Sequence, residues 1–195
     1  MRFELDELQL DASDTIRKIV LEDDALDRLH EFGAFDSTLV AVTFEEIGYA
    51  GVSVPIELDG EEATVAAAAQ LVGLGQRMLD MTVDYVKERR QFGVPVGSFQ
   101  AVKHQLADAL KEVAFARPAV WRAAATLEPR DVSMAKAMAS DAASFVARRA
   151  LQCHGAIGYT VEYELHRFLK QTWVLARSFG DAAWHRDRIA KELHI

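Results

Sequence analysis

The feature that most constrains this chain is a long stretch of helical periodicity from Glu61 to Arg90. Apolar residues recur there every three to four positions and no proline interrupts them, as in a helix with a buried face. Some 30 helical residues span about 45 Å at the standard rise per residue. Acidic Glu61 and Glu62 at the start and basic Lys87 near the end suit the helix dipole. A helix this long needs neighbours of similar length to cover its apolar positions.

Similar helical patterns follow, separated by short turns, and helices joined in this way pack as antiparallel neighbours. The chain has only four prolines, and half of its residues are hydrophobic, which is enough for a core. The expected helices run from Ser98, a possible N-cap, to about Leu127 with a kink at Pro118, from Asp131 to about His154, and from about Glu162 through an interruption at 178–181 to Ile195. We therefore predict an all-α protein in which residues 59–195 form an antiparallel four-helix bundle with an extra terminal helix.

Residues 1–58 are predicted to form a shorter N-terminal helical segment. Helical patterns cover about Asp6 to His30 and Ser37 to Gly48, and Gly51 is a suitable stop for the second. The stretch after it is extended, because Pro55 cannot lie in a helix interior. Only a two-residue turn, DG, then separates this segment from the long helix, and no run of alternating strands lies between them.

The overall charge and composition exclude several classes of function. A net charge of −8 argues against nucleic-acid binding, because no basic surplus exists to displace counterions from phosphates. The single cysteine cannot form an internal disulfide, and the six histidines show no metal-ligand spacing. The first residues do not resemble a signal peptide, and the longest purely apolar run, near 65–69, is too short to cross a bilayer. We expect a cytoplasmic protein with no metal, nucleic-acid or membrane partner.

Two short stretches are more specific than a helical bundle requires. RRQFGVPVGSFQ, residues 89–100, forms the turn after the long helix, and QCHGAIGY, residues 152–159, lies where another helix ends. The fork of an arginine matches pyrophosphate oxygens, and small residues let a ligand approach the backbone. The same residues also make sense as a helix C-cap at Arg89 and turn glycines at Gly93 and Gly155. On local physics alone this simpler interpretation is favoured, because such short motifs often occur by chance.

Together, at this separation and on this order of helices, the two stretches closely resemble the C-terminal helical domain of the acyl-CoA dehydrogenases. The motifs that carry the resemblance are ERRQFG…FQ and Q-x-x-G-x-x-G-Y, and it covers Glu61 to about Ile195. A weaker resemblance extends upstream, through MRFELDELQLDASDTIRK and TFEEIGYAGVSVPIE. It implies a flavoenzyme fold in which one subunit grips the pyrophosphate and adenosine half of the FAD held by its neighbour. The positions that match this role are Arg89, Phe92, Gln100, Gln152, Gly155 and Ala156.

The chain also departs from the family pattern. The middle β-domain, which covers the flavin ring and shapes the acyl pocket in the family, is absent. The glutamate of the family's Glu-Gly-Thr motif falls on Phe179, and the alternative base position of some relatives falls on Ala63. Neither side chain can accept a proton, so no catalytic residue is expected in this chain. We interpret Glu61 and Glu62 as solvated first-turn residues, and Asp181 as the N-cap of the last helix.

The chain thus retains the elements that would bind a flavin held by a neighbouring subunit, and it lacks those that would bind a flavin of its own. The leading hypothesis is the smaller subunit of a heteromeric FAD-dependent acyl-CoA dehydrogenase, which oxidises acyl-CoA to trans-2-enoyl-CoA in lipid metabolism. A larger partner subunit would supply the base and the β-domain within a hetero-oligomer such as a heterotetramer. The absence of a β-domain from this chain would leave room for a bulky, steroid-like acyl group. Three alternatives stay open: a self-sufficient homodimeric flavoenzyme with Asp181 or Glu62 as base, a cofactor-free scaffold, and an artificially shortened enzyme.

Overall fold

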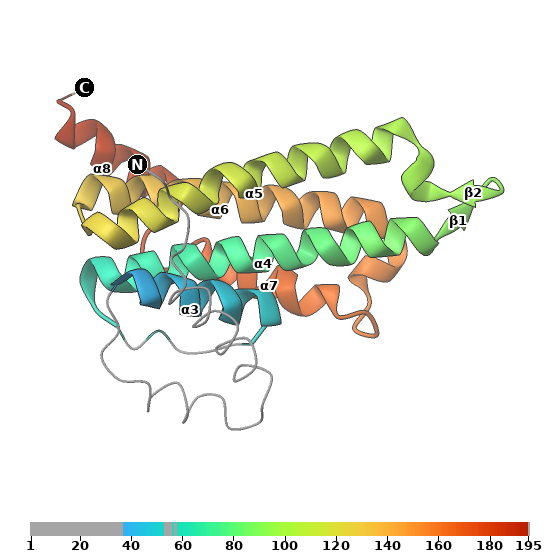
Figure 1. The fold of residues 1–195 in the computed structure, drawn as a ribbon, viewed down its shortest axis with the longest axis horizontal. Helices are drawn as coiled ribbons and strands as arrows, with labels where there is room; N and C mark the ends of the chain where they lie inside the picture. The colour runs from blue at the N-terminus through green and yellow to red at the C-terminus, as the bar shows by residue number, and fades with distance from the viewer. Residues whose placement is uncertain (1–36, 53–55, 57, 195) are drawn as a thin grey trace.

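A computed structural model describes residues 37–52, 56 and 58–194 of the chain (Figure 1). Its helices are α3 (Ser37–Ala50), α4 (Gly60–Glu88), α5 (Gln100–Thr126), α6 (Pro129–His154), α7 (Leu165–Leu175) and α8 (Ala182–Glu192). The short elements are strands β1 (Arg90–Gln91) and β2 (Val94–Pro95) and the 3₁₀ turns η1 (Val96–Ser98) and η2 (Gly155–Tyr159). The predicted all-α class is confirmed. The helix expected at Asp6–His30 lies outside the described residues.

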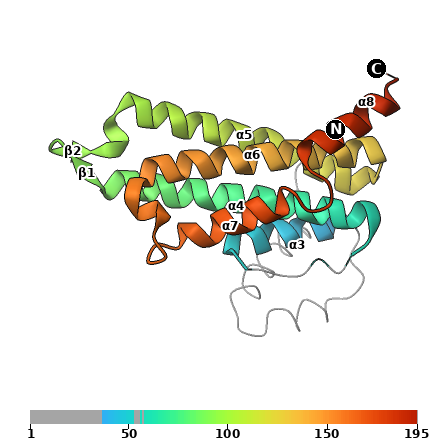
Figure 2. The same cartoon turned by 180° about the vertical axis from the view of Figure 1, so that it is seen from behind.

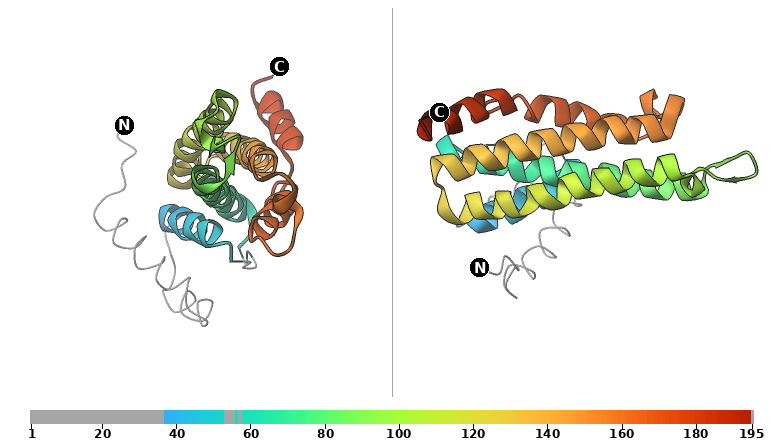
Figure 3. Two further views of the ribbon diagram at one scale, coloured as in Figure 1. Left: turned by 90° about the vertical axis from the view of Figure 1, so that its right-hand side faces the viewer. Right: turned by 90° about the horizontal axis from the view of Figure 1, so that it is seen from above.

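The three long helices α4, α5 and α6 run alternately up and down, and α7 returns along α4 (Figures 1 and 2). Seen along their axes, these four helices surround one core, with α3 against the outer side of α4 (Figure 3). Small residues make this close packing possible, because the run from Ala66 to Ala69 on α4 is completely buried. The predicted antiparallel bundle is therefore observed, with α7 and α8 as its interrupted fourth part.

Helices α3 and α4 cross with their backbones in contact. A Cβ atom added to Gly48 on α3 would lie 2.2 Å from the carbonyl oxygen of Gln70. One added to Gly73 on α4 would lie 1.9 Å from the carbonyl oxygen of Glu45. Glycine is thus required at both positions by space, which fixes the point at which α3 docks on α4.

Several helix ends differ from the expected ones. Ser98 does not cap α5: its hydroxyl donates to the carbonyl of Pro95 at 2.7 Å, and Phe99 precedes the helix without a side-chain cap. Asp131 does not cap α6, which begins at Pro129, a position where the missing N–H costs nothing. Asp181 does cap α8, since its carboxylate accepts the backbone N–H of Trp184 at 2.8 Å. This last cap was predicted.

The connection between α3 and α4 is short, and it leaves no room for a β-domain. Residues 51–59 separate the two helices, and β1 and β2 are the only strands in the described part of the chain. None of the described helices is long and apolar enough to cross a membrane.

Candidate functional site

The two sequence motifs meet at one end of the bundle, where the β1–β2 hairpin projects from α4 and η2 follows α6 (Figure 1). An open pocket of about 390 Å³ lies between the end of α4, the hairpin, the start of α5 and the end of α6. Its lining residues are Tyr85, Arg89, Gln91, Val96, Val102, Gln105, Gln152, Cys153, His154, Gly155 and Ala156. Residues more than 60 positions apart in the chain therefore share one site.

Four of the six residues predicted to bind a cofactor line this pocket, namely Arg89, Gln152, Gly155 and Ala156. The other two lie beside it: Phe92 is 92% exposed at the hairpin tip, and Gln100 is an exposed first residue of α5. The cofactor-binding role of all six residues stays a prediction. Sequence reasoning missed Tyr85, Gln91 and Gln105. The only signal for each was its position in the chain. Tyr85 lies one turn before Arg89, Gln91 lies within the first motif, and Gln105 lies about one turn after Gln100.

A tight turn with unusual backbone angles forms the hairpin tip. Gln91 pairs with Val94 across the strands, and the two residues between them both have positive φ, +53° at Phe92 and +82° at Gly93. This is the backbone pattern of a two-residue hairpin turn that normally takes Asn-Gly. A phenylalanine in the left-handed region is uncommon and costs free energy. Its ring meets that of Phe99 edge to face, with 6.3 Å between centroids.

The opposite wall of the pocket is backbone from the end of α6. Gly155 follows the helix with φ +65° and ψ −140°, a region essentially restricted to glycine. A Cβ atom at this glycine would meet nothing within 4 Å, so conformation rather than space requires it. The chain then turns through η2, which brings Gly155 and Ala156 to the pocket surface.

The pocket is suited to an anion because of its side chains. No acidic residue lines it, although the whole chain has a net charge of −8, and Arg89 supplies a full positive charge. Three glutamine amides, from Gln91, Gln105 and Gln152, add donors and acceptors. Two helix C-terminal ends, those of α4 and α6, and one N-terminal end, that of α5, meet here, so the helix dipoles on balance disfavour an anion. The attraction for an anion at this site must therefore come from Arg89.

Cys153 and His154 form part of the wall but offer no reactive group. Burial raises the pKa of the Cys153 thiol above its ordinary value, which keeps it protonated. His154 is 4% exposed, and burial lowers the pKa of its imidazole, so the ring is neutral. Its Nδ1 lies 2.8 Å from the carbonyl oxygen of Ala150, and its ring stacks on Tyr85.

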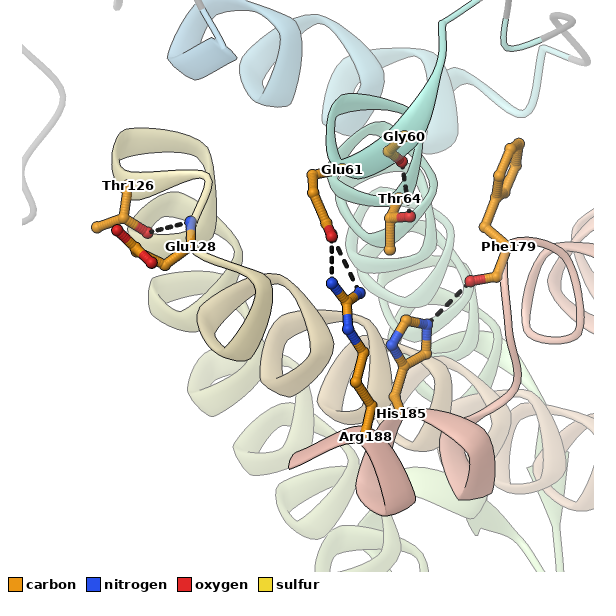
Figure 4. A network of polar contacts seen from close by, with 8 residues as sticks. All are labelled: Gly60, Glu61, Thr64, Thr126, Glu128, Phe179, His185 and Arg188. Carbon is orange, nitrogen blue, oxygen red and sulfur yellow. Dashed lines mark hydrogen bonds and ion pairs between the residues drawn. The ribbon is translucent and has the colours of Figure 1, made fainter. Parts of the chain in front are cut away.

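At the other end of the bundle lies the segment where the family's catalytic glutamate was expected (Figure 4). Phe179 stands there with φ +57°, and its carbonyl oxygen is 2.9 Å from Nε2 of the buried His185. Glu61 is not the solvated residue that we expected. It forms an ion pair with Arg188 of α8, and both side chains are about 29% exposed. Glu62 is exposed, as predicted.

A buried lysine holds the same segment in place. Lys136 of α6 is completely buried and donates to the carbonyl oxygen of Gly180 at 3.0 Å, to that of Ala176 at 3.4 Å and to the Ser140 hydroxyl at 3.0 Å. Burial lowers the pKa of Lys136 from 10.5 to about 8. The backbone between α7 and α8 is thus fixed by two buried side chains, Lys136 and His185. At position 179 it carries a phenylalanine, which offers no carboxylate to a substrate.

Within the described part of the chain, no group of three or more His, Cys, Asp or Glu residues could hold a metal ion. The chemistry that this arrangement supports is therefore the binding of an anionic ligand at one end of the bundle by Arg89, amides and exposed backbone. The described residues there include no nucleophile or base poised for catalysis.

Comparison with known proteins identifies the fold. The family model for the acyl-CoA dehydrogenase C-terminal domain matches residues 58–194. The chain therefore belongs to the acyl-CoA dehydrogenase family, and the resemblance expected from the two motifs is confirmed. It is 38% identical over 133 residues to the acyl-CoA dehydrogenase IpdE2 of Mycolicibacterium smegmatis, an alignment that covers 68% of this chain and 43% of that protein.

Two solved structures show the same arrangement of helices. The Tcur3481-Tcur3483 steroid ACAD variant matches with a TM-score of 0.66 and 33% identity, covering 69% of this chain and 38% of that one. The ChsE4-ChsE5 complex of Mycobacterium tuberculosis matches with a TM-score of 0.66 and 28% identity, covering 77% and 40%. The chain thus spans less than half the length of the relatives that it matches here.

Proposed function

We propose that this chain is the smaller subunit of a heteromeric acyl-CoA dehydrogenase, and that the pocket beside Arg89 holds the pyrophosphate and adenosine half of an FAD whose flavin ring lies in a larger partner subunit. The observation that carries the proposal is the pocket itself. It combines Arg89, three amides and the bare backbone at Gly155, and no acidic residue lines it. This donor set fits a pyrophosphate flanked by a nucleoside.

The opposite end of the bundle supports a division of labour between subunits. Phe179 occupies the position expected for a base, and the loop around it is held by Lys136 and His185. With residues 51–59 as the only connection between α3 and α4, no β-domain intervenes to cover a flavin ring. The partner would therefore supply both the catalytic glutamate and the β-domain.

When bound, FAD supplies the acceptor for the hydride that leaves the β-carbon of an acyl-CoA. The part of this chain is to bind and orient, with Arg89 on the phosphates and Phe92 and Gln100 on the flank of the nucleotide. A bulky, ring-containing acyl group is the proposed substrate, since one of the matched structures is a steroid ACAD. A matched complex of two named chains, ChsE4 and ChsE5, supports a hetero-oligomer such as a heterotetramer.

The first prediction concerns Arg89. In the complex of this chain with its co-expressed partner, Arg89→Ala should weaken FAD binding by roughly 10- to 150-fold, because a charged hydrogen-bonding contact contributes about 1.5–3 kcal/mol. The measurement is the FAD dissociation constant by flavin fluorescence. Arg90→Ala is the matched control, since Arg90 carries the same charge in the same hairpin but does not line the pocket.

Three results would contradict the proposal. One is an unchanged FAD affinity in the Arg89→Ala complex. Another is a chain that, purified alone, holds stoichiometric FAD and oxidises acyl-CoA, which would favour the self-sufficient homodimer with an unusual base. The third is a complex that is colourless as isolated and takes up no FAD, which would favour a cofactor-free scaffold.

A further inference from the structure

We propose that Tyr85 is a positioning residue of the pocket, which holds the wall that carries Arg89 and the wall that carries Gly155 and Ala156 in a fixed relation to each other. This inference rests on the proposed function, because it concerns the same nucleotide pocket. It assigns a role to a residue that lies outside both sequence motifs. Tyr85 contributes to the pocket lining from the last turn of α4.

The first wall begins one turn after Tyr85. The backbone N–H of Arg89 donates to the carbonyl oxygen of Tyr85 at 2.9 Å, and Arg89 then leaves the helix with φ −63° and ψ 122°. Any residue at position 85 would accept this hydrogen bond. What matters is that the tyrosine side chain therefore starts from the same helical turn that sets the position of Arg89.

The second wall is reached by the tyrosine hydroxyl. Tyr85 Oη donates to the carbonyl oxygen of His154 at 3.4 Å, a long hydrogen bond between residues 69 positions apart. His154 is the last residue of α6, where carbonyl groups lack partners inside the helix. On the other side of the same peptide plane, the N–H of Gly155 donates to the carbonyl of Leu151. The planar peptide before Gly155 is thus held at both its oxygen and its nitrogen.

Aromatic packing gives this link its stiffness. The rings of Tyr85 and His154 stack with centroids 4.4 Å apart and an interplanar angle of 23°. Tyr163 meets both rings, at 6.0 Å from Tyr85 and 4.8 Å from His154. The Nε2 atom of His154 is buried and has no hydrogen-bond partner among the described residues, so packing and the single Nδ1 contact hold this ring. The three rings form a rigid support behind the pocket wall.

A hydroxyl deletion separates positioning from packing. Tyr85→Phe keeps the ring stack and the backbone bond to Arg89, but it removes the donor to the His154 carbonyl. Tyr49→Phe is the matched control: its hydroxyl donates to the Asp80 carboxylate at 3.0 Å, and neither Tyr49 nor Asp80 lines this pocket. The Tyr49 hydroxyl donates to a carboxylate at the shorter distance, so Tyr49→Phe should lower the melting temperature of the complex at least as much as Tyr85→Phe.

The test compares FAD with FMN as probes in the complex of this chain with its partner. FMN keeps only one of the two phosphates and lacks the adenosine, so its binding depends on this pocket much less than that of FAD. We expect Tyr85→Phe to weaken FAD binding by up to about tenfold and FMN binding by less, since the net contribution of one hydrogen bond sets the upper limit. Tyr49→Phe should leave the ratio of the FAD and FMN dissociation constants at its wild-type value.

The possible failures can be distinguished. If the wild-type complex does not prefer FAD to FMN, and Arg89→Ala changes neither constant, the proposed function and this inference both fall. If Arg89→Ala weakens FAD binding but Tyr85→Phe does not, only the role of Tyr85 is overturned. The role is also overturned if Tyr49→Phe shifts the ratio as much as Tyr85→Phe, because the effect would then be one of general stability.

Discussion

At the scale of single residues, Lys136 is the clearest case of a side chain whose environment reverses the usual expectation. Lysine is almost never fully buried, yet this one has no exposed surface. Its ammonium group is satisfied by two backbone carbonyls and the Ser140 hydroxyl. Asp181 offsets part of the burial effect on its pKa, which still falls to about 8. Three hydrogen bonds to the charged form thus compensate only part of the cost of removing it from water.

Removal of Lys136 should change how stability depends on pH. Because its pKa falls from 10.5 to about 8 on folding, protonation favours the unfolded chain. The contribution of Lys136 to the free energy of unfolding should therefore rise by up to about 1.4 kcal/mol per pH unit between about pH 8 and pH 10.5, and level off above that. Lys136→Met should lack this rise. Urea unfolding of both proteins at several pH values tests it, and a difference that does not change with pH would contradict the burial effect.

The residues of the candidate site could be predicted only where their type is informative by itself. Arg89, Gln152 and Gly155 belong to motifs with unusual composition, and the structure brings them together at one pocket. Tyr85 could not be recognised, because a tyrosine near the end of an apolar helix is indistinguishable from a core residue. The ion pair of Glu61 was equally hidden, since its partner Arg188 is 127 positions away.

At the scale of elements, the crossing of α3 and α4 determines how α3 docks on the bundle. Helix bounds on α4 and α6 were predicted to within about two residues, because periodicity, proline and glycine act locally. The crossing itself is tertiary. No local pattern shows that Gly48 and Gly73 face another backbone, and the requirement appears only when a Cβ atom is placed on each.

Gly73→Ala should therefore destabilise the protein strongly. The new Cβ would lie 1.9 Å from the Glu45 carbonyl oxygen and 2.7 Å from the Tyr49 nitrogen, and backbone atoms cannot move aside as side chains do. We expect a loss of about 2–3 kcal/mol in the free energy of unfolding.

Gly75→Ala is the control on the same helix. Its Cβ would lie 3.3 Å from a methyl group of Val113 and 3.6 Å from Cα of Ala143, contacts that need little or no shift, and alanine is the better helix former. Urea unfolding should give Gly75→Ala a much larger free energy of unfolding than Gly73→Ala. Equal stabilities would mean that the two helices can separate at no cost.

At the scale of the whole molecule, the two ends of the bundle have opposite characters. One end is open, with a pocket, an arginine and accessible backbone, whereas the other is closed by the Glu61–Arg188 pair and by Lys136. Sequence comparison located both ends, but it did not predict that the second is held shut, because that depends on contacts between α4, α6 and α8.

Restoring the missing carboxylate should accordingly fail to restore an active site. Phe179→Glu places an acid where the family's base was expected, but the loop stays held by Lys136 and His185, and no β-domain covers it. We expect the variant chain alone to show no acyl-CoA-dependent reduction of an electron-accepting dye. Any turnover above that of the wild-type chain would show that the loop can support catalysis and lacks only the carboxylate.

The hairpin tip has a consequence for how a cell must supply this protein. A phenylalanine that is 92% exposed, in a backbone conformation that phenylalanine seldom adopts, is a poor feature for a chain that stays free in solution. Copies made in excess of the binding partner that covers this ring would tend to aggregate or to be degraded. We therefore expect a cell to make this polypeptide in no more than the amount of the protein that covers the hairpin tip.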